Sequence, residues 1–81
     1  MNIEKIDEPI GMLADFSGGQ CRPVRFTWKS RSYDVSTVNG QWIDREGGTL
    51  SLHYSVQAAG QTWLLHLNIH DVQWRLDQVV V

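Results

Sequence analysis

The sequence predicts an all-β fold, either a small antiparallel barrel or a folded sheet of about six short strands. Apolar residues recur at every second position along most of the chain, which is the period of a half-buried strand, and no segment shows a helical period. Turn-forming residues interrupt this pattern roughly every ten residues, as in small all-β proteins. At 81 residues, the chain is expected to be one domain, residues 1–81, with a small core.

The first half of the chain contains an arm, a strand and a hairpin. Residues 1–8 carry three acids and one lysine, and we expect them to form a loose N-terminal arm. Apolar residues alternate over 10–16, and the segment SGGQ at 17–20 is a turn. The stretch PVRFTWKSRSYDV, residues 23–35, alternates on both sides of a polar tip, with Val24 on the apolar face. This pattern predicts a hairpin.

The second half contains the cleanest alternation of the chain. Residues 50–56 and 63–69 alternate on either side of a turn centred on Ala59 and Gly60. With that turn the two apolar faces coincide, which fixes the register of a hairpin with one buried side. The expected pairs are Leu52 with Leu67, His53 with His66, Tyr54 with Leu65 and Val56 with Trp63.

Two further features complete the expected fold. Asn39 and Gly40 predict a turn, because both residues tolerate positive φ. A last strand is expected within 72–81, where the alternation weakens near the end. The predicted core consists of the inward-facing apolar residues Phe26, Trp28, Tyr33, Val35, Leu52, Tyr54, Trp63, Leu65, Leu67 and Trp74.

Composition excludes several classes of protein. A charged fraction of 20% and a net charge of −2 argue against a disordered chain and against a globally basic nucleic-acid binder. Cys21 is the only cysteine, so no internal disulfide forms, and a small domain without disulfides suits a reducing compartment. The first ten residues lack the apolar core of a signal peptide, and no apolar run approaches the ~20 residues of a membrane span. We therefore expect a cytoplasmic protein that does not contact membranes.

The order of motifs resembles a family of small bacterial domains of unknown function. The resemblance covers roughly residues 8–80, from EPI through RPVRFTWKSRSYDV and Trp42 to WRLDQV, and the hairpin is its most specific part. Members of that family occur alone or at the C-terminus of Y-family, translesion-type DNA polymerase proteins. This chain departs from them at the hairpin tip, where Ser30 replaces a glycine, and in its less basic fourth and fifth strands. The resemblance implies an accessory role in DNA repair or translesion synthesis, and no catalytic residue.

The basic hairpin is the candidate binding surface. Arg25, Lys29 and Arg31 supply positive charge beside aromatic residues, a combination used by proteins that bind single-stranded nucleic acid. The alternation favours a plainer interpretation, in which the aromatic residues are core and the charges solvate the outer face. Arg25 and Asp34 can then offset each other's charge, which leaves Lys29 and Arg31 at the tip.

The remaining reactive residues do not assemble a recognisable site in the sequence. His53 and His66 are expected to face each other, with His70 further along, but the third ligand of a metal site is missing, since only Asn68, Ser51 or water is obvious. We therefore expect no metal and no cofactor. Cys21 lacks a general base nearby in sequence and is expected to be a structural thiol, so no catalytic residue is assigned.

These observations favour a non-catalytic protein-interaction module that is a monomer or a weak dimer with a free sheet edge. The alternative function is weak nucleic-acid binding by the 22–33 hairpin. A small metal-dependent or thiol-dependent enzyme is the third possibility.

Overall fold

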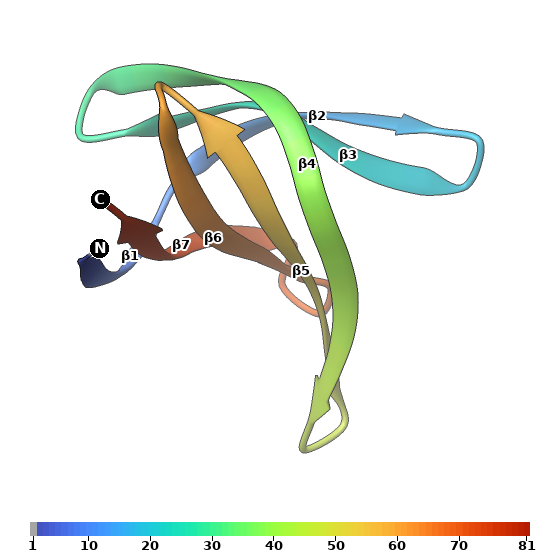
Figure 1. The fold of residues 1–81 in the computed structure, drawn as a ribbon. Helices are drawn as coiled ribbons and strands as arrows, with labels where there is room; N and C mark the ends of the chain where they lie inside the picture. Colours follow the sequence, from blue (N-terminus) through green and yellow to red (C-terminus); the bar gives the residue numbers. More distant parts are fainter. Residues whose placement is uncertain (1) are drawn as a thin grey trace.

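The computed structural model describes residues 2–81, which form seven antiparallel strands. The strands are β1 (Ile3–Pro9), β2 (Gly11–Ser17), β3 (Gln20–Trp28), β4 (Arg31–Glu46), β5 (Thr49–Ala58), β6 (Gln61–Asn68) and β7 (Gln73–Val80). They follow the order β1-β7-β6-β5-β4-β3-β2 (Figure 1). The all-β prediction is confirmed in its folded-sheet form, because β1 and β2 end the order and the sheet does not close into a barrel. Residues 2–81 form seven strands where about six were expected.

Strand β4 is the element that folds the sheet. Its first part pairs with β3 and its longer second part pairs with β5, and Figure 1 shows it curving from one hairpin to the other. The turn predicted at Asn39 and Gly40 is wrong, because the strand continues through both residues. Two register shifts against β5, between Val35 and Thr37 and between Val38 and Gly40, insert extra residues into β4. Such bulges bend a strand without ending its pairing.

The prediction of a loose arm at residues 1–8 is also wrong for residues 3–8, because they belong to strand β1. Strand β1 pairs with β7, and Asn2 and Val81 exchange backbone hydrogen bonds of 3.0 and 2.8 Å at its end. The four charged residues of β1 had suggested an arm. An edge strand can nevertheless form with few apolar residues, because backbone pairing with its neighbour holds it. Ile6 supplies the apolar contact with the core, and the Trp28 indole donates a 3.2 Å hydrogen bond to Glu8.

The core lies between the folded halves of the sheet. Five of the ten predicted core residues are buried, and the other five are partly buried and pack around the core or line its margin. Val24 is the exception on the apolar face, because it is 40% exposed while Pro23 beside it is buried. The register of β2 and β3 shifts at this point, so the extra residue reverses the alternation. The buried apolar residues are Phe26, Tyr54, Val56, Ala58, Trp63, Leu65, Leu67, Leu76 and Val79.

Aromatic contacts join the two halves. The Phe26 ring stacks on Tyr33 with centroids 5.0 Å apart, and it meets Trp63 edge-on at 5.3 Å. The Trp63 indole donates a 2.8 Å hydrogen bond to the Ala58 carbonyl, so its polar atom is satisfied in the core. These contacts connect β3 and β4 with β6 across the fold.

The β5–β6 hairpin has the predicted register. All four predicted pairs occur, including His53 opposite His66, and the turn is centred on Ala59 and Gly60, with φ of 49° and 74°. The alternation of apolar and polar residues was sufficient to predict this register, because one face of the hairpin is buried along its whole length. This register places the two histidines side by side on the face opposite the core.

Candidate functional site

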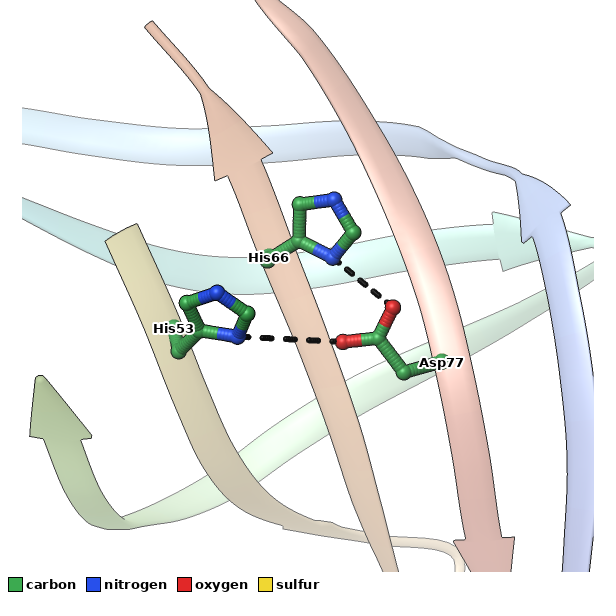
Figure 2. A group of neighbouring side chains, drawn as sticks. All are labelled: His53, His66 and Asp77. Carbon is green, nitrogen blue, oxygen red and sulfur yellow. Dashed lines mark hydrogen bonds and ion pairs between the residues drawn. The ribbon is translucent and has the colours of Figure 1, made fainter. Parts of the chain in front are cut away.

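The first candidate site is a cluster of His53 on β5, His66 on β6 and Asp77 on β7. The two imidazole rings stack with centroids 5.0 Å apart and an interplanar angle of 27°. His66 Nδ1 lies 2.8 Å from one carboxylate oxygen of Asp77, which is a hydrogen bond, and His53 Nδ1 lies 3.9 Å from the other. Figure 2 shows both rings turned toward the carboxylate. Three adjacent strands therefore direct nitrogen and oxygen donors to one point.

A β-bulge places Asp77 in this cluster. Leu64 pairs with Gln78 and the next residue, Leu65, pairs with Leu76, so Asp77 is an extra residue in β7. Leu76 and Val79 are both buried, although they are three positions apart. The residues between them therefore share the polar face, where a bulge can re-aim a side chain.

The sequence interpretation missed Asp77. It considered only Asn68, Ser51 or water as a third ligand, because a regular register gives no reason to single out a residue of the last strand. The weakened alternation after Leu76 was the available signal, since two adjacent polar residues between buried ones are typical of a bulge. His70 lies outside the cluster, in the exposed turn after β6, where its backbone N–H donates to Asn68.

The histidines border a groove in the polar face of the sheet. Its volume is about 440 Å³, and Asp44, Thr49, Ser51, His53, His66 and Asn68 line it. The Trp42 ring stacks on His53 with centroids 5.5 Å apart and planes inclined by 12°. Asp44 places a carboxylate oxygen 3.9 Å from His53 Nε2. His53 is thus held between an aromatic face and two carboxylates, and only 21% of its side chain is exposed.

The second candidate site is the basic hairpin formed by β3 and β4. Arg25 Nε donates a 2.6 Å hydrogen bond to Asp34, its partner across the hairpin, as the sequence suggested. This pair is well exposed, with 53% and 75% of the two side chains accessible, and it removes Arg25 as an uncompensated charge.

The tip of that hairpin carries the other two predicted binding residues. Lys29 Nζ lies 4.9 Å from the centre of the Trp28 ring, a cation–π contact, and Arg31 is exposed opposite Trp28 in the register. The structure therefore brings Lys29 and Arg31 together at the tip. The aromatic rings beside them belong mainly to the core, because Trp28 and Tyr33 both pack against Trp63.

The two edges of the sheet form the third candidate surface, and they differ sharply. Strand β1 has four charged side chains among seven residues, and Asp7 adds a bulge with φ of 50°. Strand β2 has a single charged residue, Asp15, and exposes Leu13 at 59% and Phe16 at 67%. Charges and bulges protect an edge strand from pairing with another chain. The β1 edge is therefore protected, whereas the β2 edge is open and apolar.

Comparisons with protein-family models, with curated proteins and with solved structures give no match to this chain. The resemblance of residues 8–80 to the family of small bacterial domains thus stays a prediction. Within residues 2–81 no helix is present that could cross a membrane.

Proposed function

We propose that the protein is a non-catalytic interaction module that binds an extended segment of a partner protein along the open edge of β2. The observation that carries the proposal is the contrast between the two edges of the sheet. Among residues 2–81, strand β2 pairs only with β3, so the backbone N–H and C=O groups on its other side are available to another strand. Addition of a strand to a sheet edge is a common mode of peptide recognition.

The side chains of β2 indicate what the partner strand contains. Leu13 and Phe16 are exposed on this strand, and Val24 of β3 adds a further exposed apolar side chain. A strand laid beside β2 would place its own side chains opposite Leu13 and Phe16, the exposed apolar residues of β2 itself. We therefore expect a partner segment with apolar or aromatic residues and no proline in its centre, since proline lacks the N–H that the edge requires.

The family resemblance gives the first partners to test. It suggests an accessory role in DNA repair, so we propose components of translesion DNA synthesis as the initial candidates. A single cysteine, Cys21, suits a reducing compartment, and we place the interaction in the cytoplasm. In this proposal the free protein is a monomer or a weak dimer, because charges protect the β1 edge and the open β2 edge is seven residues long.

The experiment compares matched substitutions on the two edges. Leu13 on β2 and Ile3 on β1 are each 59% exposed, so lysine at either position changes an edge and leaves the core intact. Binders are first selected from a library of displayed extended peptides, and their affinity is then measured for Leu13→Lys and Ile3→Lys. We expect Leu13→Lys to weaken binding at least about tenfold and Ile3→Lys to leave it unchanged, because lysine protects an edge from strand addition.

Chemical-shift mapping gives an independent readout. Bound peptide should perturb the amides of β2 and protect them from hydrogen exchange, since the peptide supplies their missing partners. Equal sensitivity to both lysine substitutions, or perturbation of β1 in place of β2, would refute the assignment of β2 as the binding edge.

Nucleic-acid binding is the second candidate function. The exposed pair of cations at the hairpin tip, Lys29 and Arg31, favours it. The ion pair between Arg25 and Asp34 opposes it, because it leaves few charges for phosphate contacts.

A further inference from the structure

We infer that His53, His66 and Asp77 form a binding site for one divalent transition-metal ion, with zinc as the reference ion. The inference is independent of the proposed partner edge, because the cluster lies on β5, β6 and β7. It replaces the expectation of no metal, which depended on the lack of a third ligand. Asp77 supplies that ligand from the bulge in β7.

The donor set suits such an ion. Two imidazole nitrogens and one carboxylate oxygen are ligands that zinc accepts in sites with three protein ligands and an open fourth position. The three donor atoms already lie within 4.8 Å of one another. Ligands at 2.0–2.2 Å from a tetrahedral zinc ion are about 3.4 Å apart, so rotations of the side chains that move the donors by about 1 Å complete the site. The ion would replace the proton in the hydrogen bond between His66 Nδ1 and the Asp77 carboxylate.

The surroundings orient the ring of His53. Trp42 stacks on one face of this ring, and Asp44 lies near Nε2, the nitrogen that points away from Asp77. A metal-bound histidine usually gives its other N–H to a carboxylate, which fixes the tautomer and strengthens the bond to the ion. Asp44 lies 3.9 Å from Nε2 and would close to hydrogen-bond distance when the ion binds, so it is a positioning residue for His53 and brings a second negative charge near the ion.

A neighbouring cation, Arg75, is engaged away from the site. Arg75 pairs with His66 in the register of β6 and β7 and so lies beside the cluster. Its guanidinium turns toward β1, where it bonds to the Asp7 carboxylate at 3.1 Å and to the Asp7 carbonyl at 2.8 Å. The carboxylate of Asp77 is left to the two histidines. His53 and His66 also line the groove with Ser51 and Asn68, so an ion held by the two histidines would lie at the border of that groove.

The test uses the full chain and zinc alone. Calorimetric titration should show one ion per chain, and a hundredfold excess of zinc over its dissociation constant should raise Tm by more than about 10 °C. Asp77→Asn keeps the shape of the side chain and removes its charge, so it should weaken zinc binding more than a hundredfold, as should His53→Ala. Asp44→Asn should weaken binding about tenfold to a hundredfold, the usual cost of losing a residue that orients a ligand.

A control and a second readout keep the test decisive. His70→Ala removes an exposed histidine outside the cluster and should leave zinc affinity unchanged. Because Trp42 stacks on His53, zinc should change the fluorescence of the wild type and should change it much less in Trp42→Phe. His53→Gln replaces His53→Ala if the alanine variant lowers the Tm of the metal-free protein. No saturable one-to-one binding, or equal affinity in wild type and Asp77→Asn, would overturn the inference.

Discussion

The phenol of Tyr54 donates a 2.7 Å hydrogen bond to the backbone carbonyl of Cys21. Tyr54 is buried on β5, and Cys21 lies near the start of β3, so this bond ties the β2–β3 hairpin to the central strands. The hairpin carries the proposed partner edge. Its position relative to the rest of the sheet therefore depends on this bond as well as on the core.

Removal of the phenol should destabilise the protein. Tyr54→Phe keeps the ring in place and leaves the Cys21 carbonyl without its side-chain donor. We expect a loss of about 0.5–1.5 kcal/mol in the free energy of unfolding, the usual net contribution of one hydrogen bond, because this bond is only partly buried. Denaturant unfolding of the two proteins measures it. Tyr33→Phe is the control, because no hydrogen bond from the Tyr33 hydroxyl occurs among residues 2–81. Equal losses in both variants would show that the bond has no special role.

The same residue predicts a sensitivity to alkali. Burial raises the pKa of Tyr54 well above its ordinary value, and the neighbouring Cys21 raises it further. The unfolded chain therefore loses the phenol proton near pH 10, while the folded protein still holds it. The stabilisation is complete below that pH. Above it, the free energy of unfolding should fall by up to about 1.4 kcal/mol per pH unit until the folded phenol also ionises.

Unfolding measured at a series of alkaline pH values checks this expectation, with Tyr54→Phe as the reference. The variant lacks the phenol, so its stability should fall less steeply above pH 10. Parallel curves for the two proteins would mean that Tyr54 ionises equally easily in the folded and unfolded states.

The chain offers matched pairs for testing the core. Leu65 and Phe26 are fully buried, whereas Leu13 is 59% and Phe16 is 67% exposed. Leu65→Ala and Phe26→Ala should each cost about 2–5 kcal/mol, because each leaves a cavity in a small core. Leu13→Ala and Phe16→Ala should each cost less than about 1 kcal/mol. Denaturant unfolding measures all four, and similar losses within a pair would contradict the assigned burial.

These pairs also show what alternation could and could not predict. Leu65 and Phe26 follow the two-residue period and were assigned to the core from sequence. Phe16 has the same period, but its end of the hairpin extends beyond the core, so the period alone could not reveal its exposure. The alternation in the sequence indicates which face of the sheet a side chain lies on. Whether that face is buried depends on how far the other half of the folded sheet extends over it.

Bulges account for most of the other differences. Each inserts one residue and reverses the alternation, as at Val24 in β3 and at Asp77 in β7. The sequence-based register could predict that His53 faces His66, because no bulge interrupts β5 and β6 between them. It could not place Asp77 beside them. Two of the three residues of the proposed metal site were thus brought together from the sequence, and the bulge in β7 supplied the third.

The hairpin tip predicts a stabilising substitution. Lys29 and Ser30 have φ of 50° and 63°, which is the left-handed region that side chains disfavour. Such a two-residue turn favours glycine at its second position. Ser30→Gly should therefore raise the free energy of unfolding by about 0.5–1 kcal/mol, measured by thermal or denaturant unfolding.

The turn between β5 and β6 supplies the converse control. Gly60 has φ of 74°, and a Cβ added there would meet no atom within 4 Å. Gly60→Ala should destabilise through backbone conformation alone, by about 1 kcal/mol. A destabilising effect of Ser30→Gly would show that the tip does not hold this turn in solution.

The hairpin also predicts how the protein behaves toward nucleic acid. Arg25 is paired with Asp34, so Lys29 and Arg31 are the predicted binding residues left to contact phosphates at the tip. Each phosphate contact on a single strand contributes about −0.7 to the slope of log affinity against log salt concentration, so two contacts give a slope of about −1.4. Binding should therefore be weak at low salt and negligible at physiological salt. Fluorescence anisotropy of a labelled single strand across a salt series measures both quantities.

Two variants distinguish charge at the tip from charge elsewhere. Lys29→Ala and Arg31→Ala combined should abolish the residual binding, because both phosphate contacts are lost. Asp34→Ala should instead strengthen binding and steepen the salt dependence, since it releases Arg25 from its ion pair and restores a third cation. Tight binding that persists at physiological salt and disappears in the double variant would make nucleic-acid recognition the principal function of this hairpin. The low affinity and the shallow salt slope both follow from how few cations this surface offers to a phosphate backbone.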